Sequence, residues 1–279
     1  METNMGLFSR KKSKDEHRTV APNVSSGLLL SYQTANLQGI GTRAQQEDSF
    51  GFVNVLDVTK IREKGLLAIV ADGMGGMKGG KAASDTAVAS IREDFEKFDY
   101  SGDLAQQLRN SVDNANERIY DMLDGAGGTT LISCLFYREK LYFACVGDSY
   151  LYLKRGNHLY SLNRKHSVLY DEFLRTIRNS DFDPSVAREN EEKHALSCFL
   201  GMEMLDDIDY LRRPLKLLGG DILLLCSDGV GGVLSEEGVI SCLNMPVAKD
   251  MCSELEKEIL KQNLKYQDNY TALVIKCEY

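Results

Sequence analysis

The sequence predicts an α+β fold in which two mainly antiparallel β-sheets pack face to face between pairs of helices. Three observations support this prediction. Apolar runs of strand length recur along the 279 residues, and two long stretches between them carry apolar residues at helical spacing. Several neighbouring strand candidates are joined by tight turns, which is typical of antiparallel pairs. We therefore expect the helices to cover the outer faces of a β-sandwich.

The first 30 residues differ in character from the rest of the chain. They are polar and charged, with SRKKSKDEHR followed by APNVSSG, and no periodicity would bury a face. We expect residues 1–30 to be a mobile leader and residues 31–279 to form one folded domain. Strand-like runs at 31–37, 50–55 and 66–71 then predict an opening meander.

Two helices are expected next. The first, at 81–98, carries apolar residues at every fourth position, namely Ala83, Ala87, Ile91 and Phe95. The second, at 104–123, has one apolar face and ends before the glycines at 125, 127 and 128. Two such helices side by side would cover one sheet.

A dense β region follows, with strand candidates at 130–137, 141–146, 150–154 and 158–162 in a series of hairpins. The polar stretch that begins at Asn163 predicts an insertion over the sheet, and we expect a flap at about 163–200. Strands return at 210–217 and 222–226. Helices at 235–243 and 247–262 precede the last strand, at 270–277.

Composition excludes several classes of protein. The net charge is −8 and the only basic cluster is at 10–14, so nucleic acid is not expected as a partner. Seven cysteines lie mostly within apolar runs without CxxC spacing, as reduced core cysteines do. The chain has no signal-like segment and no apolar stretch long enough to cross a membrane. We therefore expect a cytoplasmic protein.

Acidic residues stand beside four of the strand candidates. Glu47 and Asp48 precede the run at 50–55, Asp72 follows 66–71, Asp228 follows 222–226, and Asp268 precedes 270–277. Carboxylates gathered at strand ends repel one another unless a cation offsets the repulsion. Hard divalent ions such as Mg²⁺ or Mn²⁺ take oxygen ligands of this kind. The pattern therefore predicts a divided metal site.

The motifs together resemble those of the metal-dependent protein phosphatases, the type 2C serine/threonine phosphatase family, and in particular its compact bacterial members. The resemblance spans about residues 32–275. Its motifs, in order, are Arg43 with Glu47-Asp48, the string ADGMGG at 71–76, Gly128-Thr129-Thr130, the string VGDS at 146–149, His166-Ser167, Ser227-Asp228-Gly229 and Asp268-Asn269.

The resemblance implies a two-metal site at one end of the sandwich. In it Asp72 would bridge the ions, Gly73 would offer its backbone carbonyl, Asp228 and Asp268 would hold the second ion, and Glu47 and Asp48 would act through bound water. Arg43 would hold the phosphate oxygens with its fork of donors. A water shared by the ions would attack phosphorus directly, without a covalent phosphoenzyme. Either Mn²⁺ or Mg²⁺ would serve, and Asp148 with Asp228 would bind a third ion.

Three positions depart from the family pattern. Gln46 stands where asparagine is common, and we expect it to be tolerated. Lys165 stands where an aspartate often precedes the His-Ser pair, so it adds a cation near the flap. Met74 stands where some relatives carry a histidine proposed as the general acid. His166 is a possible substitute, although a structural hydrogen bond is the commoner role for such a histidine.

Each assignment has an alternative. Asp72, Asp228 and Asp268 are also suited to capping turns, Asp148 to a tight turn, and Arg43 to the surface. At the level of the whole protein, one hypothesis is a phosphatase that acts on phosphoserine and phosphothreonine in the substrates of a cognate kinase. The other is a non-enzymatic regulatory module that keeps the fold and binds a partner. Because all the expected ligands are present, the residues favour the enzyme.

Overall fold

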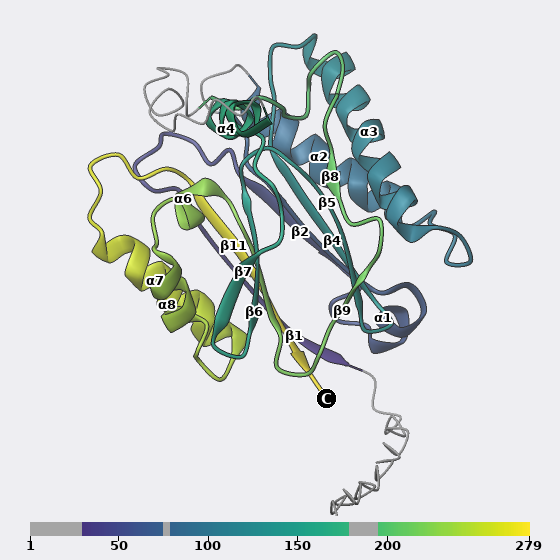
Figure 1. The fold of residues 1–279 in the computed structure, drawn as a ribbon, viewed down its shortest axis with the longest axis vertical. Helices are drawn as coiled ribbons and strands as arrows, with labels where there is room; N and C mark the ends of the chain where they lie inside the picture. The colour runs from purple at the N-terminus through teal and green to yellow at the C-terminus, as the bar shows by residue number, and fades with distance from the viewer. Residues whose placement is uncertain (1–29, 75–78, 179–194) are drawn as a thin grey trace, which may run out of the picture.

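The computed structural model describes residues 30–74, 79–178 and 195–279. In this part of the chain two β-sheets pack against each other, with one helix pair on each outer side (Figure 1). The predicted sandwich and its helical flanks are therefore confirmed. The expected leader lies outside the described residues except for Leu30, and so does the section 179–194 of the expected flap.

The first sheet has the strand order β1-β11-β10-β6-β7. Its members are β1 (Ser31–Gly39), β11 (Tyr270–Glu278), β10 (Ile222–Cys226), β6 (Tyr150–Arg155) and β7 (His158–Ser161). Every neighbouring pair in it is antiparallel. The first and last strands of the folded domain thus lie side by side.

The second sheet has the order β2-β3-β4-β5-β8, and β9 also pairs with β5. It consists of β2 (Ser49–Val53), β3 (Leu66–Ala71), β4 (Leu131–Tyr137), β5 (Lys140–Val146), β8 (Asp209–Tyr210) and β9 (Leu215–Lys216). These pairings are antiparallel as well.

Two expectations about connectivity are wrong. The opening strands do not form a meander, because β1 belongs to the first sheet whereas β2 and β3 pair in the second. The series of hairpins is also interrupted, since β5 and β6 lie in different sheets. Strand periodicity reports which residues are extended and buried, but it does not report the partner strand.

The expected strand at 210–217 is instead two short strands, β8 and β9. Pro214 lies between them and has no backbone N–H to donate to a neighbouring strand, so the ladder is broken there.

On the side of the second sheet lie α2 (Gly80–Phe95) and α3 (Leu104–Leu123), and on the side of the first lie α7 (Glu236–Cys242) and α8 (Ala248–Lys261). The expected helices match these four within a few residues. The sequence analysis did not anticipate α6 (Asp228–Gly231) or α1 (Val58–Lys64). Asp57 caps α1 by accepting hydrogen bonds from the backbone N–H groups of Thr59 and Lys60.

The core forms three layers because the central strands are covered on both faces. In β3 the side chains of Leu67, Ile69 and Ala71 pack toward α2 and α3, whereas the alternate residues pack between the sheets. Residues of β10 alternate in the same way between the sheet interface and the side of α7 and α8. This double burial explains why both strands read as uninterrupted apolar runs.

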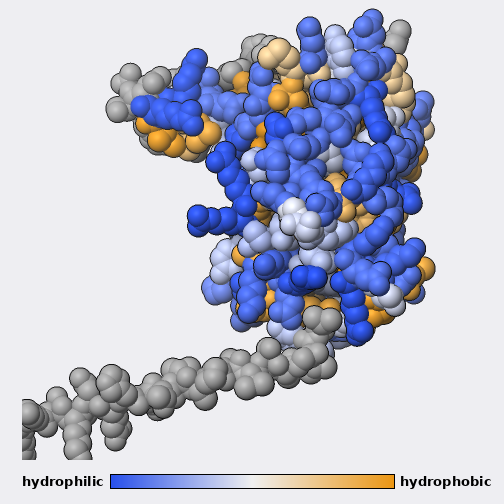
Figure 2. Space-filling model, turned by 90° about the vertical axis from the view of Figure 1, so that its right-hand side faces the viewer, coloured by the Kyte–Doolittle hydropathy of each residue, from blue (hydrophilic) through white to orange (hydrophobic). Residues whose placement is uncertain are grey.

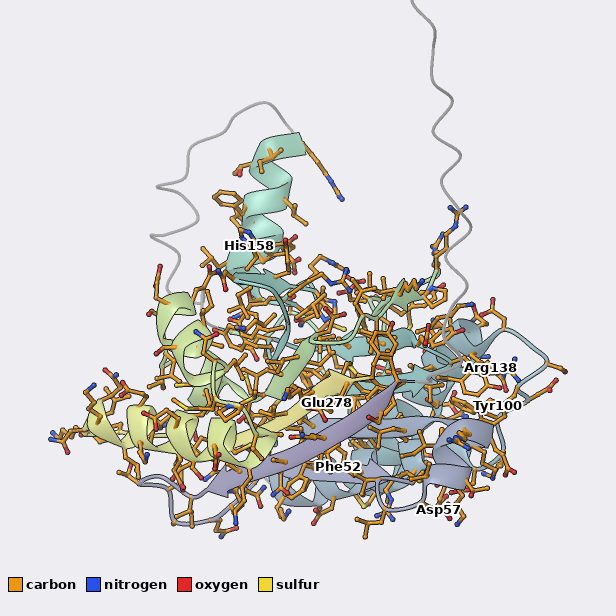
Figure 3. All side chains as sticks on the ribbon, turned by 90° about the horizontal axis from the view of Figure 1, so that it is seen from below. Phe52, Asp57, Tyr100, Arg138, His158 and Glu278 are labelled. Carbon is orange, nitrogen blue, oxygen red and sulfur yellow. The ribbon has the colours of Figure 1, made fainter. Side chains whose placement is uncertain are left out.

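The two ends of the sandwich differ. Asp57, Tyr100 and Arg138 lie together at one end (Figure 3), where the β4–β5 turn meets α1 and the loop before α3. The strands β3 and β10 run toward the other end, where α6 and α4 (Val168–Arg178) lie (Figure 1). It is this second end that carries the acidic residues.

The outer surface beside α2 and α3 is mostly hydrophilic (Figure 2), as expected for helices that bury only one face. All seven cysteines are buried, as expected for core residues. Among the described residues, none of the helices has the length and apolar character needed to span a bilayer.

Candidate metal-dependent active site

Five aspartates meet at the second end of the sandwich because each stands just before or after a strand. In the second sheet Ser49 pairs with Ala71, and continuing that register by one residue sets Asp48 opposite Asp72. In the first sheet Tyr150 pairs with Cys226, and continuing by two residues sets Asp148 opposite Asp228. Asp268 precedes β11, the strand beside β10. Antiparallel register thus gathers residues that are up to 220 positions apart in the sequence.

Asp72 occupies the centre of this group. Its carboxyl group lies beside those of Asp48 and Asp228, close enough to affect the pKa of both. Burial raises the pKa of Asp72 well above its usual range, and the charges of Asp48 and Asp228 raise it further. Burial and the neighbouring Asp148 and Asp268 also raise the pKa of Asp228, to about 6. These side chains are therefore held at a mutual electrostatic cost that a cation would relieve.

The side chain of Asp48 is held in place by Ser227. The Ser227 hydroxyl donates a 2.9 Å hydrogen bond to Asp48 Oδ2 and accepts one of 2.9 Å from the backbone N–H of Thr271. The other carboxylate oxygen of Asp48 is buried and, among the described residues, has no hydrogen-bond donor. Burial raises the pKa of Asp48. Ser227 stands in the Ser227-Asp228-Gly229 motif, but its role in holding Asp48 was not expected because the contact joins residues far apart in the sequence.

The loop that carries Glu47 is held by Asn269. The Asn269 side chain accepts a 2.7 Å hydrogen bond from the Glu47 backbone N–H and donates to the carbonyls of Ile40 and Gln45. Gln46 contributes as well, since its amide donates to the Gly39 carbonyl and accepts from the Asp48 backbone N–H. Gln46 is therefore accommodated within the loop.

The backbone around Asp72 is held by a pair of threonines. The Asp72 carbonyl accepts hydrogen bonds from the Thr130 N–H and the Thr129 hydroxyl, at 2.9 Å each, and the Asp72 N–H donates to Thr130 Oγ1. A Cβ on Gly73 would lie 2.5 Å from the carbonyl oxygens of Glu47 and Gly80. A glycine is required at this position by close backbone packing.

Arg43 is paired directly with one of the acidic residues. Its Nη2 atom lies 2.5 Å from Asp268 Oδ2, with both side chains partly exposed. This hydrogen bond raises the pKa of Arg43, and the nearby Asp228 and Glu47 act in the same direction. Arg43 thus lies at the edge of the acidic group.

His166 has a structural role. It is buried, its Nδ1 atom accepts a 2.9 Å hydrogen bond from the Gly147 backbone N–H, and the backbone N–H of His166 donates to the Gly147 carbonyl at 3.0 Å. Burial lowers the pKa of His166. Its Nε2 atom lies 3.7 Å from Asp207, which also pairs with Arg164. These contacts support the structural alternative and hold the turn before Asp148 in place.

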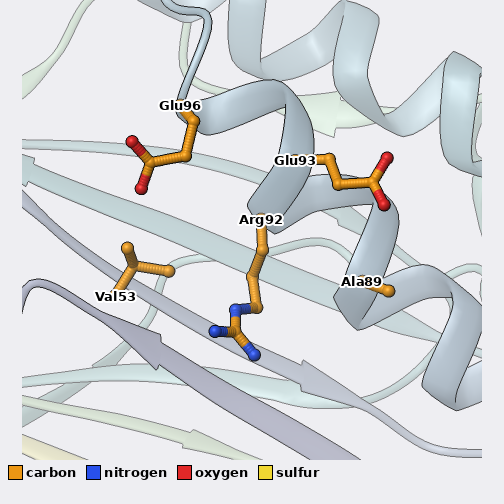
Figure 4. A pocket seen from close by; sticks show the side chains of 5 residues that line it. All are labelled: Val53, Ala89, Arg92, Glu93 and Glu96. Carbon is orange, nitrogen blue, oxygen red and sulfur yellow. The ribbon is translucent and has the colours of Figure 1, made fainter.

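A cleft of about 470 Å³ opens beside the acidic group. Its lining includes Asp148, Asp228 and Asp268 together with Lys165 and Tyr150. A second hollow, of about 340 Å³, lies between β2 and α2 and is lined by Val53, Ala89, Arg92, Glu93 and Glu96 (Figure 4). None of the aspartates described above borders this second hollow, whereas three of them line the first cleft.

The donor set suits a hard divalent ion. It consists of carboxylate and backbone oxygens, it includes a buried oxygen of Asp48 without a donor, and its members raise one another's pKa. In the part of the chain that the structure describes, no three acidic, histidine or cysteine side chains are already arranged to enclose an ion. Asp268 is one of the acidic side chains of this site, and it is paired with Arg43. Metal binding is therefore expected to rearrange the side chains.

Comparison with known proteins agrees with this site. A family model described as protein phosphatase 2C matches residues 42–267. The serine/threonine phosphatase stp of Listeria welshimeri is 30% identical over 219 residues, which are 75% of this chain and 83% of that protein. The serine/threonine protein phosphatase PstP of Mycobacterium tuberculosis is 27% identical over 254 residues, or 88% of this chain and 45% of the longer relative.

Solved structures extend the similarity to the fold. The crystal structure of M. tuberculosis PstP/Ppp has a TM-score of 0.72 and 26% identity, and the match covers 90% of this chain and all of that one. The catalytic domain of a PstP in complex with two manganese ions has a TM-score of 0.70 and 25% identity, with 90% of this chain and 100% of that chain covered.

The fold and the acidic site define a metal-dependent phosphatase of the two-sheet type. The chain belongs to the protein phosphatase 2C family, and it is a metal-dependent serine/threonine phosphoprotein phosphatase. The alternative of a non-enzymatic binding module is not favoured.

Proposed function

We propose that Asp72 bridges two divalent ions, that Gly73 offers its carbonyl to one of them, and that Asp228 and Asp268 hold the other. Glu47 and Asp48 act through bound water. The contact of Asp72 with carboxyl groups on both sides supports the bridging role, because a bridging ligand must face two ions. The raised pKa values support the need for cations.

When bound, the ions lower the pKa of a water and orient it toward phosphorus. The chain's own residues do the remaining work. Arg43 releases Asp268 and turns its guanidinium toward the phosphate oxygens, which match its planar fork of donors. Ser227 and Asn269 keep Asp48 and the Glu47 loop in register with the strand ends. His166 is buried and held by hydrogen bonds with Gly147, so we assign it no proton transfer to the leaving group.

The substrates are proposed to be phosphoserine and phosphothreonine residues in proteins modified by a cognate kinase, in the cytoplasm. The names of the relatives support the substrate class. Both Mn²⁺ and Mg²⁺ suit the oxygen ligands. Asp148 borders the cleft together with Asp228, as a ligand of a third ion would, but Lys165 borders it too.

We also propose that residues 31–279 are one catalytic domain and that the segment at about 163–200 borders the substrate. Ser167 and Leu169, at the start of this segment, line the cleft. Helix α4, which follows, has no buried residues of its own. Both features suit a segment that is laid over the site rather than built into the core.

The observation that carries the proposal is the contact of Asp72 with Asp48 and Asp228. It is tested by measuring release of phosphate from a phosphothreonine peptide with Mn²⁺, with Mg²⁺ and with EDTA. We expect turnover with a metal, none with EDTA, and loss of turnover in Asp72→Asn while the circular dichroism spectrum is unchanged.

Asp103→Asn is the matched control. Asp103 caps α3 through hydrogen bonds to the Ala105 and Gln106 N–H groups, and asparagine caps a helix equally well. Asp103→Asn removes one carboxylate at the start of α3, outside the acidic group, and should keep full activity. Full activity in Asp72→Asn would contradict the proposed mechanism.

A further inference from the structure

The Lys165 side chain lies over the aromatic ring of Tyr150 within the cleft. Its Nζ atom is 3.3 Å from the centre of the Tyr150 ring, and Tyr150 stacks on Tyr152 with the ring centres 5.6 Å apart. A Cβ on Gly231 would lie 2.4 Å from atoms of the Tyr150 ring, so only glycine leaves room for the ring there. An ammonium over a tyrosine face is held electrostatically, which restricts this otherwise flexible side chain.

Tyr150 lines the cleft together with Asp148 and Asp228, the two carboxylates expected to bind a third ion. Tyr150 pairs with Cys226 at the end of the β6–β10 ladder, and Asp148 and Asp228 each lie two residues beyond this pair. Asp148, Lys165 and Asp228 all line the same cleft. The ammonium group thus shares one compartment with both carboxylates, and Tyr150 holds it there.

The positive charge of Lys165 and the negative charges of the two carboxylates attract one another. Burial lowers the pKa of Lys165 below its usual value, and the charges of Asp148 and Asp228 offset part of this effect. Burial raises the pKa of Asp148, and Lys165 lowers it. The lysine therefore offsets part of the repulsion that a metal ion would otherwise relieve at this pair.

We propose that the ammonium group of Lys165 takes the place of a third divalent ion, so that this phosphatase binds two ions rather than three. The inference rests on the proposed two-metal function and concerns the side of the site at Asp148. A divalent ion bound there would face a fixed positive charge across a partly buried cleft, where repulsion is stronger than in bulk water. Asp148 then pairs with a side chain of its own chain instead of with a metal.

The test counts bound Mn²⁺ directly, by titration with electron paramagnetic resonance of the free ion. Lys165→Met removes the charge and keeps the length of the side chain, and Lys165→Arg keeps the charge. Lys140→Met is the matched control for a lost cation, because the exposed Lys140 begins β5 whereas Asp148 follows the far end of that strand.

We expect two bound ions in the unchanged protein, in Lys165→Arg and in Lys140→Met, and three in Lys165→Met. Adding Asp148→Asn to Lys165→Met should return the number to two. Circular dichroism of each variant confirms that it is folded.

Two results would overturn the inference: three ions in the unchanged protein with one lost in Asp148→Asn, or still only two in folded Lys165→Met. An unchanged protein that binds no Mn²⁺ would instead contradict the proposed two-metal function itself. The two failures are therefore distinguishable in one titration.

Discussion

Arg43 Nη2 lies 2.5 Å from Asp268 Oδ2, so the side chain proposed to bind phosphate is paired with a side chain proposed to bind metal. The two residues are 225 positions apart. In the proposed mechanism a metal ion at Asp268 would compete with the guanidinium for the same carboxylate oxygen. We therefore predict that loading of the metal is coupled to release of the arginine toward substrate.

Arg43→Ala should separate these two roles. Losing a charge-assisted hydrogen bond to phosphate costs about 1.5 to 3 kcal/mol, so we expect kcat/KM to fall roughly 10- to 100-fold. The half-exposed pair with Asp268 is worth about 1 kcal/mol or less, so Mn²⁺ should bind up to about fivefold more tightly. Steady-state kinetics and calorimetric titration measure the two effects, and Arg43→Lys should lie between. A variant with lower Mn²⁺ affinity would refute the competition.

The stability of the metal-free protein should fall as pH rises through the range in which Asp228 ionises. Its pKa is about 6 in the folded protein, mainly because of burial, and about 3.9 in an unfolded chain. Between these values the folded state holds a proton that the unfolded state lacks, so the free energy of unfolding decreases with rising pH.

Asp228→Asn isolates this contribution. In EDTA, the variant should gain thermal stability over the unchanged protein above about pH 6 and lose this advantage below about pH 4. With Mn²⁺ the sign reverses, because the ion binds the ionised carboxylate and protons compete with it as pH falls. Melting curves that differ by the same amount at every pH would rule out this linkage.

Ser227→Ala should destabilise the strand ends. The change leaves the Thr271 N–H and Asp48 Oδ2 without their hydrogen-bond partner in a buried position, which costs about 1 to 3 kcal/mol. Ser253→Ala is the control, since that hydroxyl donates to the Lys249 carbonyl on the exposed side of α8 and its loss should stay within about 0.5 kcal/mol. Urea unfolding in EDTA measures both, and equal losses would argue against a special role for Ser227.

Thiol reagents should leave the folded enzyme active. All seven cysteines are buried, and burial raises the pKa of Cys226, the one nearest Asp228 in sequence. A thiol that is buried and protonated reacts slowly. We expect all seven thiols to react only after denaturation, by absorbance of the released chromophore. Rapid modification of a native thiol together with loss of activity would contradict the structure.

Much of the architecture was predictable because its signals are local. The spacing in 104–123 matches α3 at both ends, and the apolar runs at 66–71 and 222–226 match β3 and β10 at both ends. The partner strands were not predictable. That β1 pairs with β11 depends on residues more than 200 positions away, and strand periodicity is the same whichever sheet a strand joins.

The sequence by itself determined the fold class and the acidic residues that stand at strand ends, since alternation, turns and local order are written in neighbouring residues. Only the tertiary structure decided which of those residues meet. The contact of Asp72 with Asp48 and Asp228, the pairing of Arg43 with Asp268, and the position of Lys165 over Tyr150 all depend on strand register. These contacts join distant segments, and their energies arise from burial and charge that exist only once the sheets have packed.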